Sequence, residues 1–140
     1  MPDVPPLVLD THAWIWLVDG NPQLSDAAKE QIDVAAVDGK VLVPAICVWE
    51  VAKLEGKGRL ILASHCRTWI DEALSQPGIR LVPLTAEIAL ESCFLPGSFH
   101  QDPADRFIVA TARIEKARIV SRDTRLLKYA EQGYVSVVSA

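Results

Sequence analysis

Four carboxylic acids occupy positions from which they could act together: Asp10, Glu50, Asp105 and Asp123. Asp10 ends the apolar run PLVLD and Asp123 follows the run ARIVS, and both runs are typical of buried strands. Glu50 is the single charged residue in the segment VLVPAICVWEVA, and Glu is rarely buried without a partner or a ligand. Asp105 lies in the first turn of a predicted helix, in DPADRFIVATA, from which its carboxylate could face a cleft.

Carboxylates that crowd into one cleft repel one another and raise one another's pKa unless a cation separates them. A ligand set made only of oxygen atoms favours a hard divalent ion such as Mg²⁺ or Mn²⁺ over zinc. Divalent ions in such sites polarise a phosphoryl group and activate water. The four acids therefore favour the hypothesis of a metal-dependent phosphodiester hydrolase.

Each acid also has a purely structural interpretation. Asp10 and Asp123 could each cap the helix that follows, since an Asp there accepts a hydrogen bond from a free backbone N–H. Asp102 and Asp105 could form a variant of the capping box, and capping is the favoured role for Asp102. Glu50 could face solvent from an otherwise buried helix.

Short apolar runs alternate with helical patterns along the chain. The strand-like runs are PLVLD, KVLVPA, IRLVPL, ARIVS and YVSVVS. The predicted helices cover residues 11–17, 25–38, 45–56, 64–75, 85–94, 103–116 and 123–131. This alternation predicts an α/β fold, with one domain over residues 1–140 and a central, mostly parallel sheet of about five strands flanked by helices. Such sheets hold their sites outside the carboxyl ends of the strands.

The composition excludes several classes of protein. Half of the residues are hydrophobic and 23% are charged, which excludes a disordered chain, and no apolar run is long enough for a membrane span. The first residues lack the pattern of a secretory signal, so we expect a cytoplasmic protein. Cys47, Cys66 and Cys93 show no metal or disulfide spacing and are predicted to be buried, reduced thiols.

The charge is unevenly distributed. A net charge of −4 argues against a broadly basic nucleic-acid-binding protein. Seven of the fourteen Lys and Arg residues nevertheless lie between Arg106 and Lys128, against only Glu115 and Asp123. A solvated basic face is the simplest interpretation of that segment taken alone.

Two of the four tryptophans are two residues apart on a predicted helix. Trp14 and Trp16 therefore point about 200° apart, since successive helical residues turn by about 100°. Both cannot easily face one core. We therefore expect one of them to belong to a dimer surface or to a groove that receives a partner's apolar segment.

Four segments together resemble the PIN-domain family, specifically the VapC-like toxin ribonucleases of bacterial type II toxin–antitoxin pairs. They are LDTHAWIWL, VWEVAKL, HQDPADRFIVATA and IVSRD, and they occur in the family's order and spacing over nearly the whole chain. The chain departs from the pattern at Pro44 and Cys47, where relatives often carry serines. That departure puts in doubt any hydroxyl contact with substrate in this segment.

The resemblance implies a set of roles for individual residues. Asp10, Glu50, Asp105 and Asp123 match the family's catalytic acids, which bind Mg²⁺ or Mn²⁺. Thr11 and Ser121 match small hydroxyl residues that orient ligands, and Asp102 is a possible additional ligand. The candidates for substrate phosphate contacts are Arg106, Arg122 and Arg125, although each could instead pair with an acid. His100 could line the groove, but a loop histidine without a role is the favoured interpretation.

The implied function is metal-assisted hydrolysis of RNA by a homodimeric endoribonuclease, held in check by a VapB-like antitoxin. The products would carry 5′-phosphate and 3′-hydroxyl ends. Two alternatives stay open: a PIN nuclease that processes RNA without being a toxin, and a non-catalytic PIN-like module that binds RNA or protein. A phospho-accepting receiver domain is rejected, because the third strand ends in Thr85 rather than Asp and the fifth offers no Lys.

Overall fold

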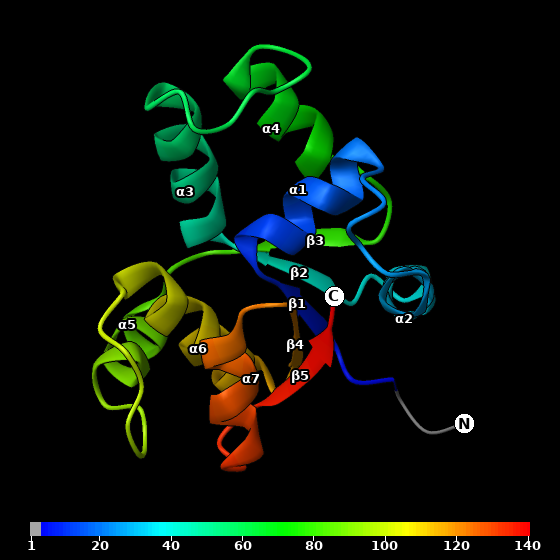
Figure 1. Cartoon of the computed structure of the whole chain (residues 1–140). Coiled ribbons are helices and arrows are strands. Elements are labelled where there is room, and N and C mark those ends of the chain that lie inside the picture. The colour runs from blue at the N-terminus through cyan, green and yellow to red at the C-terminus, as the bar shows by residue number, and fades with distance from the viewer. Residues whose placement is uncertain (1–3) are drawn as a thin grey trace.

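Five strands form one parallel sheet in the computed structural model, which describes residues 4–140 (Figure 1). They are β1 (Leu7–Leu9), β2 (Val41–Pro44), β3 (Ile79–Val82), β4 (Arg118–Ser121) and β5 (Ser136–Ser139). The order across the sheet is β3-β2-β1-β4-β5. Every residue of β1 and β2 is buried, as expected of continuous apolar strands covered on both faces, whereas the edge strands β3 and β5 are partly exposed. The predicted fold class is confirmed.

Seven helices connect the strands, and each lies within a few residues of a predicted one. They are α1 (Thr11–Asp19), α2 (Asp26–Val37), α3 (Ala45–Gly56), α4 (Cys66–Leu74), α5 (Ala86–Cys93), α6 (Pro103–Glu115) and α7 (Thr124–Glu131). Figure 1 shows α5, α6 and α7 on one side of the sheet, and α1, α2 and α4 on the other. None of the helices within residues 4–140 is long and apolar enough to cross a membrane.

The strand order creates a crevice between two neighbouring strands. The chain leaves β1 into α1 on one side of the sheet and leaves the adjacent β4 into α7 on the other side. In open α/β sheets, such a reversal of direction opens a cleft outside the carboxyl ends of the two strands. Asp10 follows β1 and Asp123 lies two residues beyond β4, so both acids are placed at this cleft.

The two neighbouring tryptophans of α1 do point in different directions. Trp14 is fully buried and packs edge to face on Trp69 of α4, with ring centroids 5.1 Å apart. Trp16 is only partly buried and faces the carboxyl-end cleft. The core therefore encloses only one of the two rings, while Trp16 packs against it with part of its surface. The expectation that one ring contacts a second copy or a partner stays a prediction.

The prediction for the cysteines is right for one residue of three. Cys47 is fully buried and lies 3.7 Å from the carbonyl oxygen of Leu9, and burial raises the pKa of its thiol. Cys66 begins α4 and is partly exposed. Cys93 is the last residue of α5 and is exposed, since the buried side of that helix is formed by Ile88 and Ser92, so the prediction of a buried thiol is wrong there.

One glycine is required by both its backbone and its surroundings. Gly78 precedes β3 with φ +83°, and an added Cβ would lie 2.6 Å from Cα of Ala36 in α2. Gly133 has a similar φ of +86° but open space around it. We predict that Gly133→Ala costs about 1–2 kcal/mol, from left-handed strain alone, and that Gly78→Ala costs about 1–3 kcal/mol more. Equal losses in urea denaturation would contradict the close approach of β3 and α2.

Candidate active site

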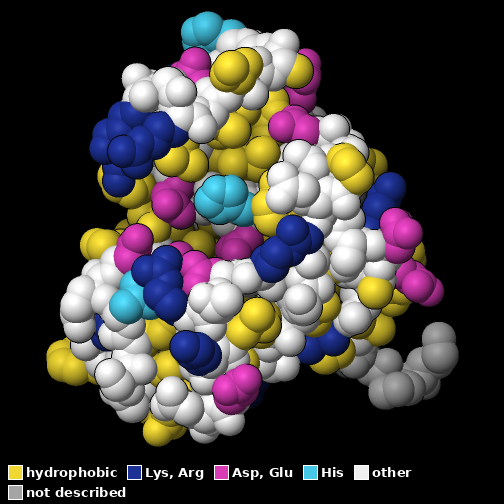
Figure 2. All heavy atoms as spheres, viewed as in Figure 1, with side chains coloured by type: hydrophobic (Ala, Val, Ile, Leu, Met, Phe, Trp, Pro, Cys, Tyr) yellow, Lys and Arg dark blue, Asp and Glu magenta, His cyan; other side chains and the backbone are white. Residues whose placement is uncertain are grey.

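A hollow of about 340 Å³ lies at the crevice and contains all four predicted acids. Its lining residues come from four helices (α1, α3, α6 and α7) or from the residues that precede them: Asp10, Thr11, His12, Trp16, Glu50, Asp102, Asp105, Ile108, Arg122, Asp123 and Arg125. Figure 2 shows acidic side chains gathered in a hollow across the middle of this face, with histidine and basic side chains around it. A larger cavity of about 680 Å³ lies at the opposite, amino-end edge of the sheet, but Glu91 is the only acid that lines it.

Asp10 combines the two roles that the sequence left open. Its carboxylate accepts a hydrogen bond of 2.8 Å from the N–H of Ala13 and thereby caps α1. The residue is only 8% exposed and borders the hollow. Burial raises its pKa, and hydrogen bonds with Ser121 and Ala13 offset only part of that effect. The carboxylate is therefore held at the crevice by its helix at a cost in desolvation.

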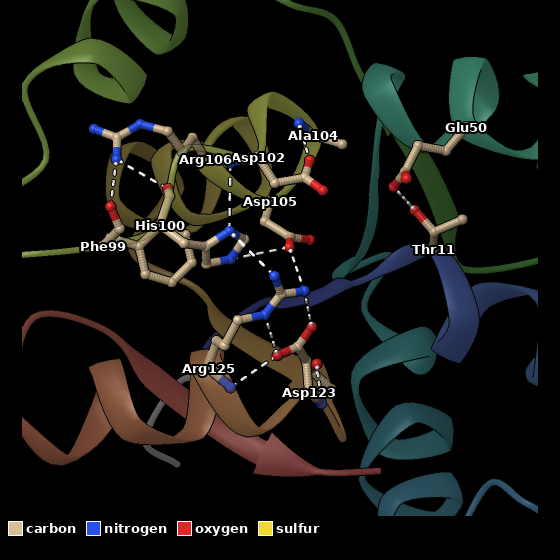
Figure 3. Close-up of polar contacts among 11 residues, drawn as sticks. Thr11, Glu50, Phe99, His100, Asp102, Ala104, Asp105, Arg106, Asp123 and Arg125 are labelled. Atoms are coloured by element: carbon tan, nitrogen blue, oxygen red, sulfur yellow. Dashed lines mark hydrogen bonds and ion pairs between the residues drawn. The ribbon is translucent and has the colours of Figure 1, made fainter.

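Glu50 enters the hollow from the second turn of α3, beside the start of α1. Thr11 donates a hydrogen bond of 2.6 Å to its Oε1, which fixes the carboxylate (Figure 3). The residue is partly buried. The solvent-facing alternative is therefore wrong, since the side chain turns toward the other acids' hollow rather than away from it.

Asp105 faces the hollow from the first turn of α6. Its Oδ2 lies 3.1 Å from Nε2 of His100 and 3.4 Å from Nη2 of Arg125. Burial, followed by the charges of Asp102 and Asp123, raises its pKa to about 7, against the opposing effect of Arg125. The raised pKa reflects first the removal of this carboxyl from water and then the neighbouring negative charges.

The capping-box interpretation of Asp105 is wrong. Asp102 does cap α6, since its carboxylate accepts a hydrogen bond of 3.0 Å from the N–H of Ala104. The N–H of Asp102 itself points to Nδ1 of His100, at 3.3 Å, rather than to the carboxylate of Asp105. Asp105 is thereby left free to face the other acids.

Arg125 bridges two of the acids. Its Nη2 lies 3.0 Å from Oδ2 of Asp123, and its Nε lies 3.3 Å from Oδ1 (Figure 3). Asp123 also accepts the backbone N–H of Arg125 at 2.8 Å and so caps α7. Burial alone would raise the pKa of Asp123, but the hydrogen bonds and charge of Arg125 outweigh it and hold that pKa below its usual value.

His100 contacts the site, although the sequence favoured a loop histidine without a role. Its ring lies between Asp105 and Arg125, whose Nη1 is 3.4 Å from Nδ1 of the histidine. Burial, followed by the charge of Arg125, lowers the pKa of His100. An accepting Nδ1 leaves the proton on Nε2, which faces Asp105. Nothing in the local sequence distinguishes this histidine from an ordinary loop residue.

The three predicted phosphate-binding arginines have different surroundings. Arg122 and Arg125 line the hollow. Arg106 does not, and its guanidinium donates instead to the backbone carbonyl oxygens of Ser92, Phe99 and His100 at 2.8–3.2 Å. The structure therefore does not support a phosphate contact for Arg106: its donors hold the loop before α6 and, with it, His100 (Figure 3).

The donor set fits a hard divalent cation, because it consists of carboxylate oxygens from four separate elements. Burial is the main cause of the raised pKa values of Asp10 and Asp105, and the charge of Asp123 adds to both. In the described part of the chain, however, no three acidic, histidine or cysteine side chains stand close enough together to form a ready ligand set. Arg125 supplies positive charge between Asp105 and Asp123 in that arrangement.

Comparison with known proteins identifies the family. Residues 7–132 match the PIN domain family. Ribonuclease VapC22 of Mycobacterium tuberculosis (strain ATCC 25618 / H37Rv) is 34% identical over 131 residues, which cover 94% of this chain and 97% of that protein.

Solved structures share the fold at lower sequence identity. A DNA-bound VapBC from Salmonella typhimurium has a TM-score of 0.70 at 12% identity, covering 96% of this chain and 98% of that chain. FitAcB from Neisseria gonorrhoeae has a TM-score of 0.63 at 24% identity, covering 95% and 96%. With the family match over most of its length and a VapC relative at 34% identity, this chain belongs to the PIN-domain family and resembles its VapC branch.

Proposed function

We propose that this protein is a metal-dependent endoribonuclease, the toxin of a type II toxin–antitoxin pair, and that Mg²⁺ or Mn²⁺ is its cofactor. The observation that carries the proposal is the convergence of Asp10, Glu50, Asp105 and Asp123 on one hollow at the crevice of the sheet. The similarity to Ribonuclease VapC22 supports RNA as the substrate and hydrolysis of its phosphodiester bonds as the reaction.

The four acids would hold the cation, with Asp102 at the rim as a possible further ligand. A divalent ion bound there supplies polarisation of the phosphoryl oxygens and a water molecule of lowered pKa. Thr11 keeps the Glu50 carboxylate in place through its 2.6 Å hydrogen bond. Ser121 is fully buried and accepts the N–H of Asp123 at 3.0 Å, which fixes the turn that carries that acid.

Arg122 and Arg125 are the basic side chains that we propose for the substrate phosphates. Both are exposed at the rim of the hollow, where an anionic backbone must pass to reach the acids. Cleavage by an attacking water with departure of the 3′ oxygen would leave 5′-phosphate and 3′-hydroxyl ends. A PIN nuclease with a role in RNA processing would use the same groups, so the toxin role rests on the comparisons alone.

An antitoxin of the VapB type and a second copy of this chain are the proposed protein partners. The similar solved structures include VapBC assemblies and a toxin–antitoxin complex from Klebsiella pneumoniae. Large apolar side chains of this chain are exposed, including Trp49 and Ile61. Figure 2 shows apolar side chains gathered above the acidic hollow, in the region that Figure 1 places between α3, α4 and α1.

The substitution Asp10→Asn separates a nuclease from a binding module. Wild type should cleave a mixed panel of RNAs in Mg²⁺ or Mn²⁺ and not in EDTA, whereas Asp10→Asn should not cleave. Asn caps helices about as well as Asp and carries no charge to bury, so the melting temperature without metal should be equal or higher. Asp71→Asn, an equal charge change on the exposed face of α4, should cleave normally. A binding module is indicated if RNA binds without being cut in any metal.

Asp105 should make the stability of the folded protein depend on pH. Asp105 has a folded-state pKa of about 7, above its usual 3.8, so the folded state binds its proton more tightly than the unfolded state. Its contribution to stability is therefore greatest below pH 4 and is lost as the pH rises through 7. In metal-free buffer, the unfolding free energy of the wild type should therefore lose this contribution between pH 4 and 7. Asp105→Asn should not show that loss. Identical pH profiles for the two proteins would show that burial does not hold this proton.

Arg125 should compete with a metal ion for the carboxylates of Asp105 and Asp123. Arg125→Gln removes the charge between Asp105 and Asp123, so Mn²⁺ should bind more tightly, by several-fold in calorimetry, and the pKa of Asp123 should rise. Arg113→Gln, which breaks an ion pair with Glu91 outside the acidic hollow, is the matched control. Unchanged Mn²⁺ affinity in Arg125→Gln would mean that the guanidinium and the metal do not use the same carboxylates.

A further inference from the structure

Trp16 and Arg122 form a stacked pair at the rim of the acidic hollow. The Arg122 guanidinium carbon lies 4.8 Å from the centroid of the Trp16 ring, and both residues line the hollow. The carbonyl oxygen of Ala140 accepts hydrogen bonds of 3.3 and 3.2 Å from Nε and Nη2 of Arg122. The guanidinium is therefore held from one edge, with its carbon over the indole ring.

Packing against the core accounts for only part of the position of Trp16. Trp14 of α1 is fully buried against Trp69, whereas Trp16 contacts the core but stays partly exposed at the hollow. Trp16 instead turns toward the carboxylates, and His12, one helical turn earlier, lies with its ring 6.0 Å from the Trp16 ring. The indole of Trp16 and the guanidinium of Arg122 therefore lie beside an acidic site, although neither group is a ligand for a metal ion.

We propose that Trp16 and Arg122 form a platform on which one unpaired RNA base stacks next to the phosphodiester that is cut. Unpaired bases bind proteins by stacking on aromatic rings and on guanidinium planes. Arg122, exposed at the rim, would also donate to a phosphate of the same strand. This inference rests on the proposed function and names its substrate as single-stranded RNA. A base inside a duplex cannot reach the platform, because its faces are covered by its neighbours.

The test uses Asp10→Asn protein in Mg²⁺, so that RNA binds without being cut. The probes are fluorescein-labelled dodecamers of A, U or C and a dodecamer of abasic ribose-phosphate units with the same charge, each measured by anisotropy. Trp16→Leu keeps an apolar side chain against the core but removes the stacking face, whereas Trp16→Phe keeps a smaller one. Trp49→Leu is the matched control, because Trp49 also carries a cation over its ring, Lys53 at 4.6 Å, but does not line the hollow.

The expected result is a base-dependent loss. Trp16→Leu should raise the Kd for the best base-bearing dodecamer by about 5- to 150-fold, and Trp16→Phe should recover most of it. Neither change, nor Trp49→Leu, should alter binding of the abasic dodecamer. Arg122→Lys should keep the salt dependence of binding, because the charge remains, but lose part of the preference for base-bearing over abasic RNA. Melting curves of each variant confirm that it is folded.

Two results would overturn the platform while leaving the nuclease intact. If Trp16→Leu weakens the binding of abasic and base-bearing dodecamers equally, Trp16 only positions Arg122 for a phosphate. If it weakens neither, the pair has no part in RNA binding. Absence of binding to every dodecamer by the parent Asp10→Asn protein would count against the proposed RNA function as well, and with it the platform.

Discussion

Like-charge repulsion in a partly dehydrated cleft is the constraint on which the rest of this structure depends. Burial raises the pKa of Asp10 and Asp105, and the charge of Asp123 raises both further. A fold gains nothing in stability from such a cluster, since each charge costs desolvation as well as repulsion. The sheet, with its buried strands β1 and β2, supplies the stability that keeps the acids together.

The surrounding side chains reduce that cost in ways that leave the acids usable. Three of the acids, Asp10, Asp102 and Asp123, also cap the helices that begin at the hollow, so helix formation itself places their carboxylates. Arg125 is exposed to solvent and pairs with acids at the hollow rather than with the core. Arg106, by contrast, uses its donors on backbone carbonyls, and so it fixes the loop that carries His100.

One side of α1 contributes to the stability of the core, and the other side contributes to the proposed site. Trp14 completes the core against α4, while Trp16 and His12 face the acidic hollow with Arg122. The helix that begins after Asp10 thus contributes one acid to the proposed metal site and Trp16 to the proposed base platform. Trp14 anchors this helix in the core, and so it helps to fix the positions of Asp10 and Trp16.

The sequence alone determined the order of strands and helices, the parallel sheet and the four acids, because apolar periodicity and capping residues are local signals. Only the tertiary structure decided which of the helix-starting acids face the cleft. The sequence allowed Asp105 to accept the N–H of Asp102 in a capping box, whereas in the structure that N–H faces Nδ1 of His100 and Asp105 lines the hollow. It also decided that Arg106 is a loop anchor and that Cys93 is exposed. These outcomes depend on contacts between segments far apart in the chain, such as Trp16 with Arg122, which no local pattern records.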